Sequence, residues 1–157
     1  MKITLLAIGK TDHKQLQQLI DEYTKRLGFY VSFNFIVIPD IKNVKNLSET
    51  QQKQAEGNEI LKRTATSDTL VLLDENGKTY SSVGFSEFLQ KKMNSGLKNL
   101  VFVIGGPYGF SEDIYKRANG KISLSSMTFS HQMVRLFFIE QLYRGFTILR
   151  NEPYHHR

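Results

Sequence analysis

Apolar segments without polar alternation recur along this sequence, and amphipathic segments separate them. Residues 2–8, 69–74 and 100–104 consist almost entirely of apolar side chains. A strand that is covered on both faces needs apolar side chains on both faces, so each such run indicates a buried strand. Residues 30–38 and 122–125 predict two further strands. The alternation predicts an α/β fold, with a parallel sheet and helices on both faces.

The intervening segments carry helix periodicity and capping signals. Residues 12–27 repeat apolar side chains every three or four positions, which predicts a helix that ends at Gly28. Ser48, with Gln51 three residues later, predicts a capping box at the start of a polar helix over 49–64. Helices are also predicted over 82–94, 112–118 and 130–149. Residues 75–78 are predicted to form a turn in which Gly77 takes a positive φ.

The length and composition limit the classes of protein. A chain of 157 residues without a change in composition is expected to form a single domain over residues 1–157. The absence of cysteine excludes disulfides and thiolate chemistry, and the spacing of the histidines predicts no metal site. No apolar run approaches the length of a membrane span, and the N-terminus resembles a strand and not a signal peptide. A soluble, cytoplasmic protein is therefore expected.

The cationic residues are unevenly distributed. The net charge is +6, and all lysines lie at or before Lys121. Beyond it the cationic side chains, histidine aside, are those of Arg135, Arg144, Arg150 and Arg157. Arginine suits phosphate and base edges, so this distribution favours an RNA partner. Ordinary surface arginines would give the same count, and both interpretations stay open.

Two loops that follow predicted strands are candidate ligand sites, because ligands of parallel sheets bind beyond the carboxyl ends of the strands. The loop at Gly105–Gly109 allows close approach to main-chain groups, although it matches neither common nucleotide motif; the alternative is simply a tight connection. Residues 124–131 combine hydroxyl groups with an apolar wall of Leu124, Met127 and Phe129. The alternative here is a helix cap at Ser130 among core residues. A third segment, 73–78, belongs to the same edge.

The last predicted helix is apolar nearly all round, which indicates burial on two sides and so a second subunit. If Phe138 lies on its outer face, Phe138→Glu would place a charge in the contact between subunits. Glu140 and Arg144 stand four residues apart and are expected to form a partly buried, functional pair. The tail carries Tyr154 and His155, suited to stacking and proton transfer. A frayed terminus is the alternative, and removal of residues 154–157 is expected to leave stability nearly unchanged.

Several short motifs together resemble a known family. They are Lys2-Ile3-Thr4 with Gly9-Lys10, Leu73-Asp74 before Gly77-Lys78, Ile104-Gly105-Gly106 before Gly109, Ser125 with Met127-Thr128-Phe129 leading to His131 and Arg135, Glu140-Gln141-Leu142-Tyr143-Arg144, and Pro153-Tyr154-His155. In this order and spacing the chain resembles the bacterial ribosomal RNA large subunit methyltransferase H family, of the SPOUT class. The resemblance extends over essentially the whole chain.

The resemblance implies methylation of N3 of a pseudouridine in 23S rRNA with S-adenosylmethionine. It also implies a homodimer and a C-terminal trefoil knot, which general rules of chain topology would not predict. Carried over position by position, the cofactor pocket consists of Leu73, Gly105, Leu124, Ser125, Ser126, Met127, Thr128 and Phe129. His155, Arg144 and Tyr154 are the catalytic candidates. Departures from the family pattern at Tyr108, Ser130 and the His156-Arg157 end put in doubt only how the tail meets RNA.

Two other classes remain open at this point. One is a SPOUT methyltransferase that acts on tRNA. The other is a non-catalytic, dimeric RNA-binding protein, which would bind no methyl donor.

Overall fold

The computed structural model describes residues 1–156, and five parallel strands form its centre. The strands are β1 (Lys2–Ile8), β2 (Ser32–Ile38), β3 (Thr69–Thr79), β4 (Asn99–Ile104) and β5 (Gly120–Ser123). Their order across the sheet is β2-β1-β4-β3-β5, and every neighbouring pair runs parallel. The predicted parallel α/β sheet is therefore confirmed.

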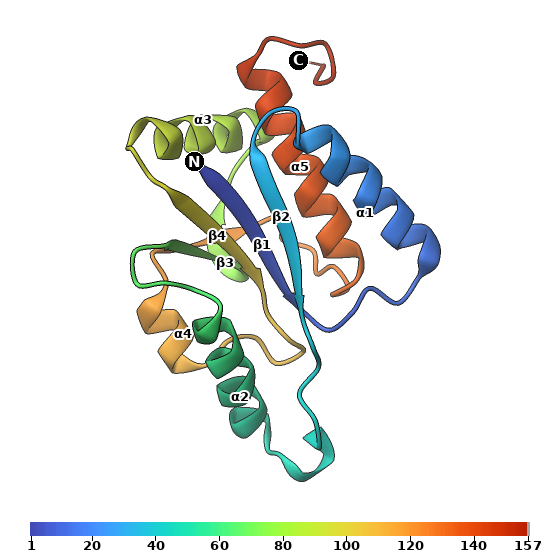
Figure 1. Ribbon diagram of the computed structural model, residues 1–157, viewed down its shortest axis with the longest axis vertical. Coiled ribbons are helices and arrows are strands. Elements are labelled where there is room, and N and C mark those ends of the chain that lie inside the picture. Colours follow the sequence, from blue (N-terminus) through green and yellow to red (C-terminus); the bar gives the residue numbers. More distant parts are fainter. Residues whose placement is uncertain (157) are drawn as a thin grey trace.

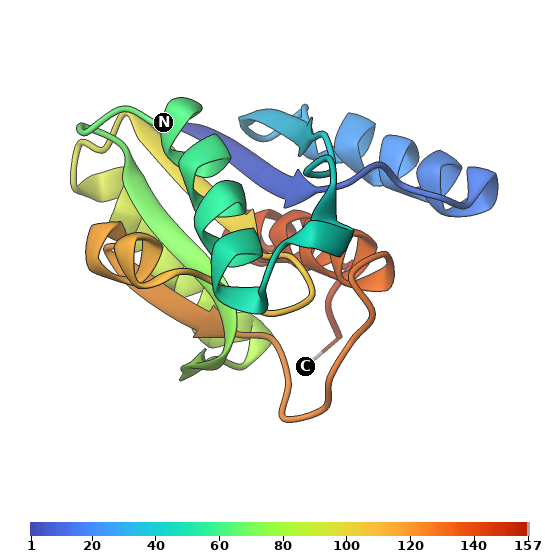
Figure 2. The same cartoon turned by 90° about the horizontal axis from the view of Figure 1, so that it is seen from below.

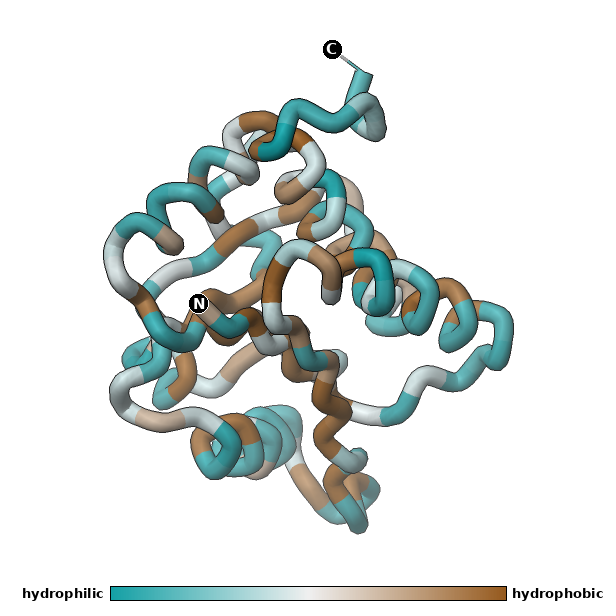
Figure 3. Tube along the Cα trace, turned by 45° about the horizontal axis from the view of Figure 1, so that its top comes forward, coloured by the Kyte–Doolittle hydropathy of each residue, from teal (hydrophilic) through white to brown (hydrophobic). Residues whose placement is uncertain are grey.

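Helices cover both faces of this sheet (Figure 1). The helices are α1 (Lys14–Leu27), α3 (Ser82–Asn94) and α5 (Met133–Leu149) on one face, and α2 (Glu49–Lys62) and α4 (Glu112–Arg117) on the other. β1 carries apolar side chains on both faces, because Ile3 and Leu5 join the core under α1 and α5 while Leu6 and Ile8 join the core under α2 and α4. In Figure 3 the central strands are accordingly hydrophobic along most of their length.

Local signals in the sequence placed most helix ends correctly. The Ser48 hydroxyl accepts a hydrogen bond from the Gln51 N–H at 3.1 Å, and the Gln51 side chain accepts one from the Ser48 N–H at 2.8 Å. This is the predicted capping box. α5 begins at Met133, three residues later than predicted, although the Ser130 hydroxyl still accepts the Met133 N–H at 3.0 Å. The last strand ends at Ser123, two residues before its predicted end.

The prediction of a turn over residues 75–78 is wrong. β3 continues to Thr79, and its pairing with β5 shifts register between Leu73 and Lys78. Gly77 keeps a φ outside the left-handed region. Its role is close approach, because a Cβ built on Gly77 would lie 2.5 Å from the carbonyl carbon of Ile122. Leu73 and Lys78 both pair with Ile122, so residues 74–77 form an irregular part of the strand pair, where a glycine admits the neighbouring backbone.

Gly77→Ala is expected to lower the free energy of unfolding by about 2 kcal/mol, because the added methyl group must push two strands apart. Gly120→Ala is the matched control on the adjacent strand, since no described atom lies within 4 Å of its Cβ position. This control is expected to change stability by less than about 0.5 kcal/mol. Urea unfolding followed by circular dichroism measures both. Equal midpoints for the two variants would contradict the assigned role of Gly77.

Candidate functional site

A cavity of about 450 Å³ lies at the carboxyl ends of β3, β4 and β5. It is lined by all three segments that the sequence singled out, 73–78, 105–110 and 124–131. Of the predicted cofactor residues, those that line it are Leu73, Gly105, Leu124, Ser125, Met127, Thr128 and Phe129. Ser126 is the one that does not. The topology thus gathers segments that are far apart in sequence around one space.

Acidic and aromatic side chains that the sequence analysis did not assign also line this cavity. Thr128 on the loop after β5 donates a hydrogen bond to Glu75 at 3.1 Å, which joins that loop to β3. Tyr115 on α4 donates to Asp74. Burial and this hydrogen bond raise the pKa of Tyr115 to about 12, so its hydroxyl remains a donor at neutral pH. Tyr115 carried no signal in the sequence, because α4 reaches the cavity only through the fold.

The loop between β5 and α5 extends away from the body of the molecule (Figure 2). Two serine hydroxyls shape it: Ser123 donates to the Ser125 carbonyl at 3.1 Å, and Ser125 accepts the Met127 N–H at 3.0 Å. Met127 is 78% exposed. The Phe129 ring lies 5.1 Å from that of Phe137 on α5. The loop therefore presents apolar side chains at the mouth of the cavity.

Arg135 does not face solvent or RNA, contrary to the interpretation of the C-terminal arginines as RNA contacts. It is 1% exposed. Its guanidinium donates to the carbonyls of His131 and Ile8, each at 2.9 Å, and to the Thr11 hydroxyl at 3.2 Å. It therefore ties the start of α5 to the end of β1. Arg157, the last of the cations assigned to RNA, lies outside the described residues.

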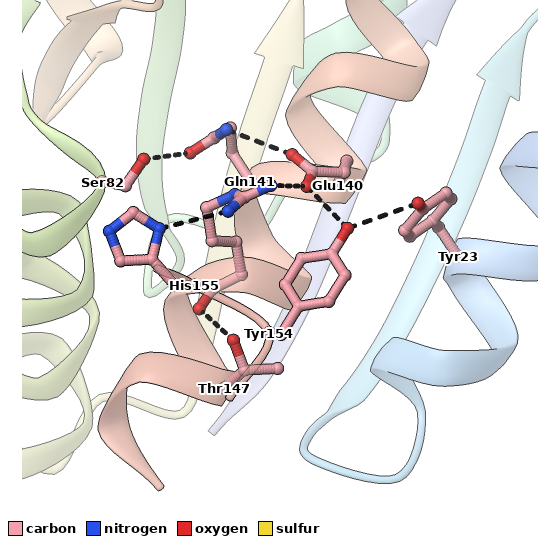
Figure 4. A network of polar contacts seen from close by, with 8 residues as sticks. Tyr23, Ser82, Glu140, Gln141, Thr147, Tyr154 and His155 are labelled. Carbon is pink, nitrogen blue, oxygen red and sulfur yellow. Dashed lines mark hydrogen bonds and ion pairs between the residues drawn. The ribbon is translucent and has the colours of Figure 1, made fainter. Parts of the chain in front are cut away.

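The predicted catalytic residues gather in a second, half-buried cluster (Figure 4). Arg144 pairs with Glu140 at 2.6 Å and contacts Nδ1 of His155 at 3.1 Å. The Tyr154 hydroxyl donates to the same Glu140 oxygen at 2.8 Å. The expected ion pair is thus present and partly buried. Since an arginine can only donate, Nδ1 of His155 accepts, and the proton of the neutral ring lies on Nε2.

The tail is docked against the helices, so the alternative of a frayed terminus is wrong for its described part. The Tyr154 ring packs edge-on against Tyr143, with ring centroids 4.7 Å apart. Its hydroxyl also lies 3.3 Å from that of Tyr23 on α1. Glu152 accepts a hydrogen bond from Tyr30. Burial and the hydrogen bonds with Tyr23 and Glu140 raise the pKa of Tyr154, so its hydroxyl stays protonated.

The two sites lie at different places along α5. Val134 in its first turn lines the cavity, and Arg144 stands ten residues further on. With a rise of 1.5 Å per residue, this separates them by about 15 Å. In Figure 1 the tail accordingly lies at the end of the molecule opposite to the tips of the strands. Arg144, Tyr154 and His155 are not among the residues that line the cavity, whereas Glu140 lines a smaller adjoining pocket that shares Ile122, Ser123, Leu124 and Phe129 with it.

Phe138 does not lie on the outer face of α5, so Phe138→Glu would not test the contact between subunits. Phe138 is fully buried, with its ring 4.7 Å from that of Phe102 on β4. α5 packs between α1 and α3, which cover much of its apolar surface within the chain. Phe137 and Met133 remain 39% and 40% exposed. A narrower apolar strip than expected is thus left uncovered beside Phe129.

Comparison with known proteins agrees with this architecture. Residues 1–155 match the family described as "Predicted SPOUT methyltransferase", and the chain belongs to this family of methyltransferases. At a finer level it is 76% identical to the "Ribosomal RNA large subunit methyltransferase H" of Flavobacterium johnsoniae and 74% identical to that of Flavobacterium psychrophilum, over 100% of each chain. The protein of the same name from Bacteroides thetaiotaomicron is 53% identical over 99% of each chain.

Two features are absent from the part of the chain that the structure describes. No helix within residues 1–156 has the length and apolar character needed to cross a membrane. Nor do the side chains of these residues form a group of three histidine, cysteine, aspartate or glutamate residues able to hold a metal ion.

Proposed function

We propose that this chain, acting as one SPOUT domain in the cytoplasm, transfers a methyl group from S-adenosylmethionine to N3 of a pseudouridine in the 23S rRNA of the large ribosomal subunit. The observation that carries this proposal is the full-length sequence identity to the two Flavobacterium proteins named "Ribosomal RNA large subunit methyltransferase H". The cavity at the strand ends and the separate cluster around Arg144 supply the two parts that the reaction needs. The implied trefoil knot stays a prediction, because strand order alone does not establish threading.

The cavity suits S-adenosylmethionine in charge and shape. Asp74 and Glu75 line it, while its lining within the described residues includes no lysine or arginine. This charge distribution favours a ligand with cationic sulfonium and ammonium groups. Leu124 and Phe129 provide an apolar wall for a flat ring, and the backbone at Gly105 admits close approach. The bound donor supplies an already reactive methyl group, so the protein has mainly to align it with the base.

The cluster around Arg144 suits the acceptor base. N3 of a pseudouridine must lose its proton, which passes to solvent water and leaves an imide anion. Arg144 presents a cationic donor, and His155 presents its Nε2–H, because Nδ1 is taken up by Arg144. Both groups would stabilise the anion by hydrogen bonds directed at its oxygens. Glu140 orients Arg144 and Tyr154 through the same carboxylate oxygen.

We further propose a homodimer in which the Arg144 cluster of one copy completes the cavity of the other. Support comes from the lining of the cavity, which within the described residues includes none of Arg144, Tyr154 and His155. The exposed apolar side chains of Met127, Phe129 and Phe137 lie close to the cavity and could be covered by a second copy. Closed two-fold association would then generate two equivalent sites.

Phe137→Glu is expected to dissociate the dimer without unfolding the chain, because it places a charge in the exposed apolar strip of α5. Phe29→Glu is the matched control, since Phe29 is 76% exposed on a different part of the surface. Light scattering at micromolar concentration should give half the wild-type mass for Phe137→Glu and the wild-type mass for the control. Circular dichroism checks that both are folded. A wild-type protein that is monomeric under these conditions would refute the dimer.

The proposed function is tested by methyl transfer from labelled S-adenosylmethionine to ribosomes purified from a strain that lacks this protein. We expect label in 23S rRNA and none in isolated tRNA offered under the same conditions. Label in tRNA instead would identify a tRNA-modifying SPOUT enzyme. Calorimetry with S-adenosylmethionine separates the non-catalytic alternative, because a pure RNA-binding protein should bind no methyl donor.

A further inference from the structure

Glu56 on α2 is buried behind the glycine-rich loop that lines the cavity. It is 4% exposed. The loop has the cavity on one side, and Gly106 meets the Glu56 carboxyl group on the other. A Cβ built on Gly106 would lie 2.3 Å from Oε2 and 2.4 Å from Oε1 of Glu56. The carboxyl group therefore occupies the volume that a side chain at position 106 would need.

Gly57, the next residue of α2, lies close to Ser111, which follows the glycine-rich loop in the chain. A Cβ on Gly57 would lie 2.7 Å from the hydroxyl oxygen of Ser111, the residue that caps α4. Between these two contacts the chain turns at Gly109, which has a φ of 85° and donates its N–H to the Gly106 carbonyl at 3.2 Å. The loop is thus held at both ends against Glu56 and Gly57.

The carboxyl group of Glu56 is not stabilised by polar partners. Within residues 1–156, Oε1 has no hydrogen-bond partner, and Oε2 has only a long contact of 3.5 Å from Gln52. Burial and, to a lesser degree, the charge of Asp40 at the end of β2 raise the pKa of Glu56. Lys53 borders the same space, but no ion pair joins it to Glu56 among the described residues. The charged form of Glu56 is therefore less favourable than that of a glutamate in water, although the Gln52 hydrogen bond acts in the opposite direction.

We propose that Glu56 is a positioning residue for the methyl-donor cavity, whose side chain sets the position of Gly106 and with it the wall formed by residues 105–109. This proposal rests on the proposed function, since it takes the cavity to be the donor site. A residue that only stabilised the fold would lower the stability of the chain when it was removed. Loss of the Glu56 carboxyl group, which is buried without polar partners, should instead leave the stability unchanged.

Two substitutions at Glu56 separate the effect of its side-chain volume on donor binding from the effect of its charge. Glu56→Ala leaves space behind Gly106, and we expect calorimetry to show affinity for S-adenosylmethionine falling about tenfold through displacement of the loop. Its thermal midpoint should stay equal to or above that of the wild type. Glu56→Gln keeps the volume without the ionisable group and should bind within about twofold of the wild type. Glu49→Gln, an exposed residue on the same helix, is the matched control.

The pH dependence provides a readout that a merely structural residue would not move. Ionisation of Glu56 as the pH rises above the ordinary glutamate range places an unpartnered charge behind the loop, near Asp40. The carboxylate must then turn toward water, and Gly106 loses its support. Wild-type affinity should therefore fall with rising pH relative to Glu56→Gln, which cannot ionise. Parallel pH profiles for the two proteins would overturn the proposal.

Hydrogen exchange without any ligand makes the test independent of the proposed function. Glu56→Ala should speed amide exchange in residues 105–110 about tenfold while exchange in the strands stays unchanged. Unchanged exchange in this loop, or acceleration spread over the whole chain, would overturn the positioning role. A wild-type protein that fails to bind S-adenosylmethionine would refute the proposed function, while the exchange result would still decide the role of Glu56.

Discussion

A mixture of two variants, each inactive alone, is expected to regain about a quarter of the wild-type methyl transfer to ribosomes. The variants are Gly105→Val, whose side chain must displace the Phe110 ring in the cavity wall, and Arg144→Ala, which removes the centre of the cluster around Arg144. If the cluster of one copy serves the cavity of the other, a mixed dimer contains one intact site of two. Random assortment makes half of all dimers mixed, which yields this fraction.

Co-expression of the two chains ensures that mixed dimers form, and transfer of labelled methyl groups measures the result. The control pairs Gly105→Val with a chain that carries both substitutions, because no mixed dimer then has an intact site. Denaturant unfolding of Gly105→Val is needed alongside, since the added side chain also meets the Phe110 ring at 3.1 Å. Absence of rescue in the first mixture, with mixed dimers demonstrated, would show that each site is built from one chain.

Arg135→Met is expected to lower the free energy of unfolding by about 3 kcal/mol, because it leaves buried acceptors without donors. The carbonyls of Ile8 and His131 would lose the guanidinium that now bonds both. Arg135→Lys should not restore stability, since one ammonium group cannot reproduce a planar fork that reaches three acceptors. His131 and Val134 line the cavity, so a loosened start of α5 should also weaken donor binding.

Arg150→Met is the matched control for this prediction. Arg150 is exposed and stacks on Tyr30, with its guanidinium carbon 4.5 Å from the ring centroid. Its loss is expected to cost less than about 1 kcal/mol. Urea unfolding of the three variants gives the comparison. Similar losses for Arg135→Met and Arg150→Met would mean that the buried hydrogen bonds contribute little.

Local patterns in the sequence were sufficient for the main elements and for the location of the cavity. The apolar runs predicted strands buried on both faces, because a parallel sheet covered by helices leaves no polar side. The pair Ser48 and Gln51 predicted a helix start, since both hydrogen bonds join residues three positions apart. The edge of the sheet where the cavity lies followed from the parallel order of the strands.

The tertiary structure alone decided which of two similar side chains is buried and which is exposed. Phe137 and Phe138 are adjacent and chemically identical, yet only the packing of α5 against β4 buries Phe138. The spacing from Glu140 singled out Arg144, but nothing in the sequence indicated that the end of β1 would enclose Arg135. Gly77 and Glu56 acquire their roles from Ile122 and Gly106, which lie far away along the chain. Periodicity reports only the neighbours within a few residues, whereas these roles depend on backbone segments that meet after folding.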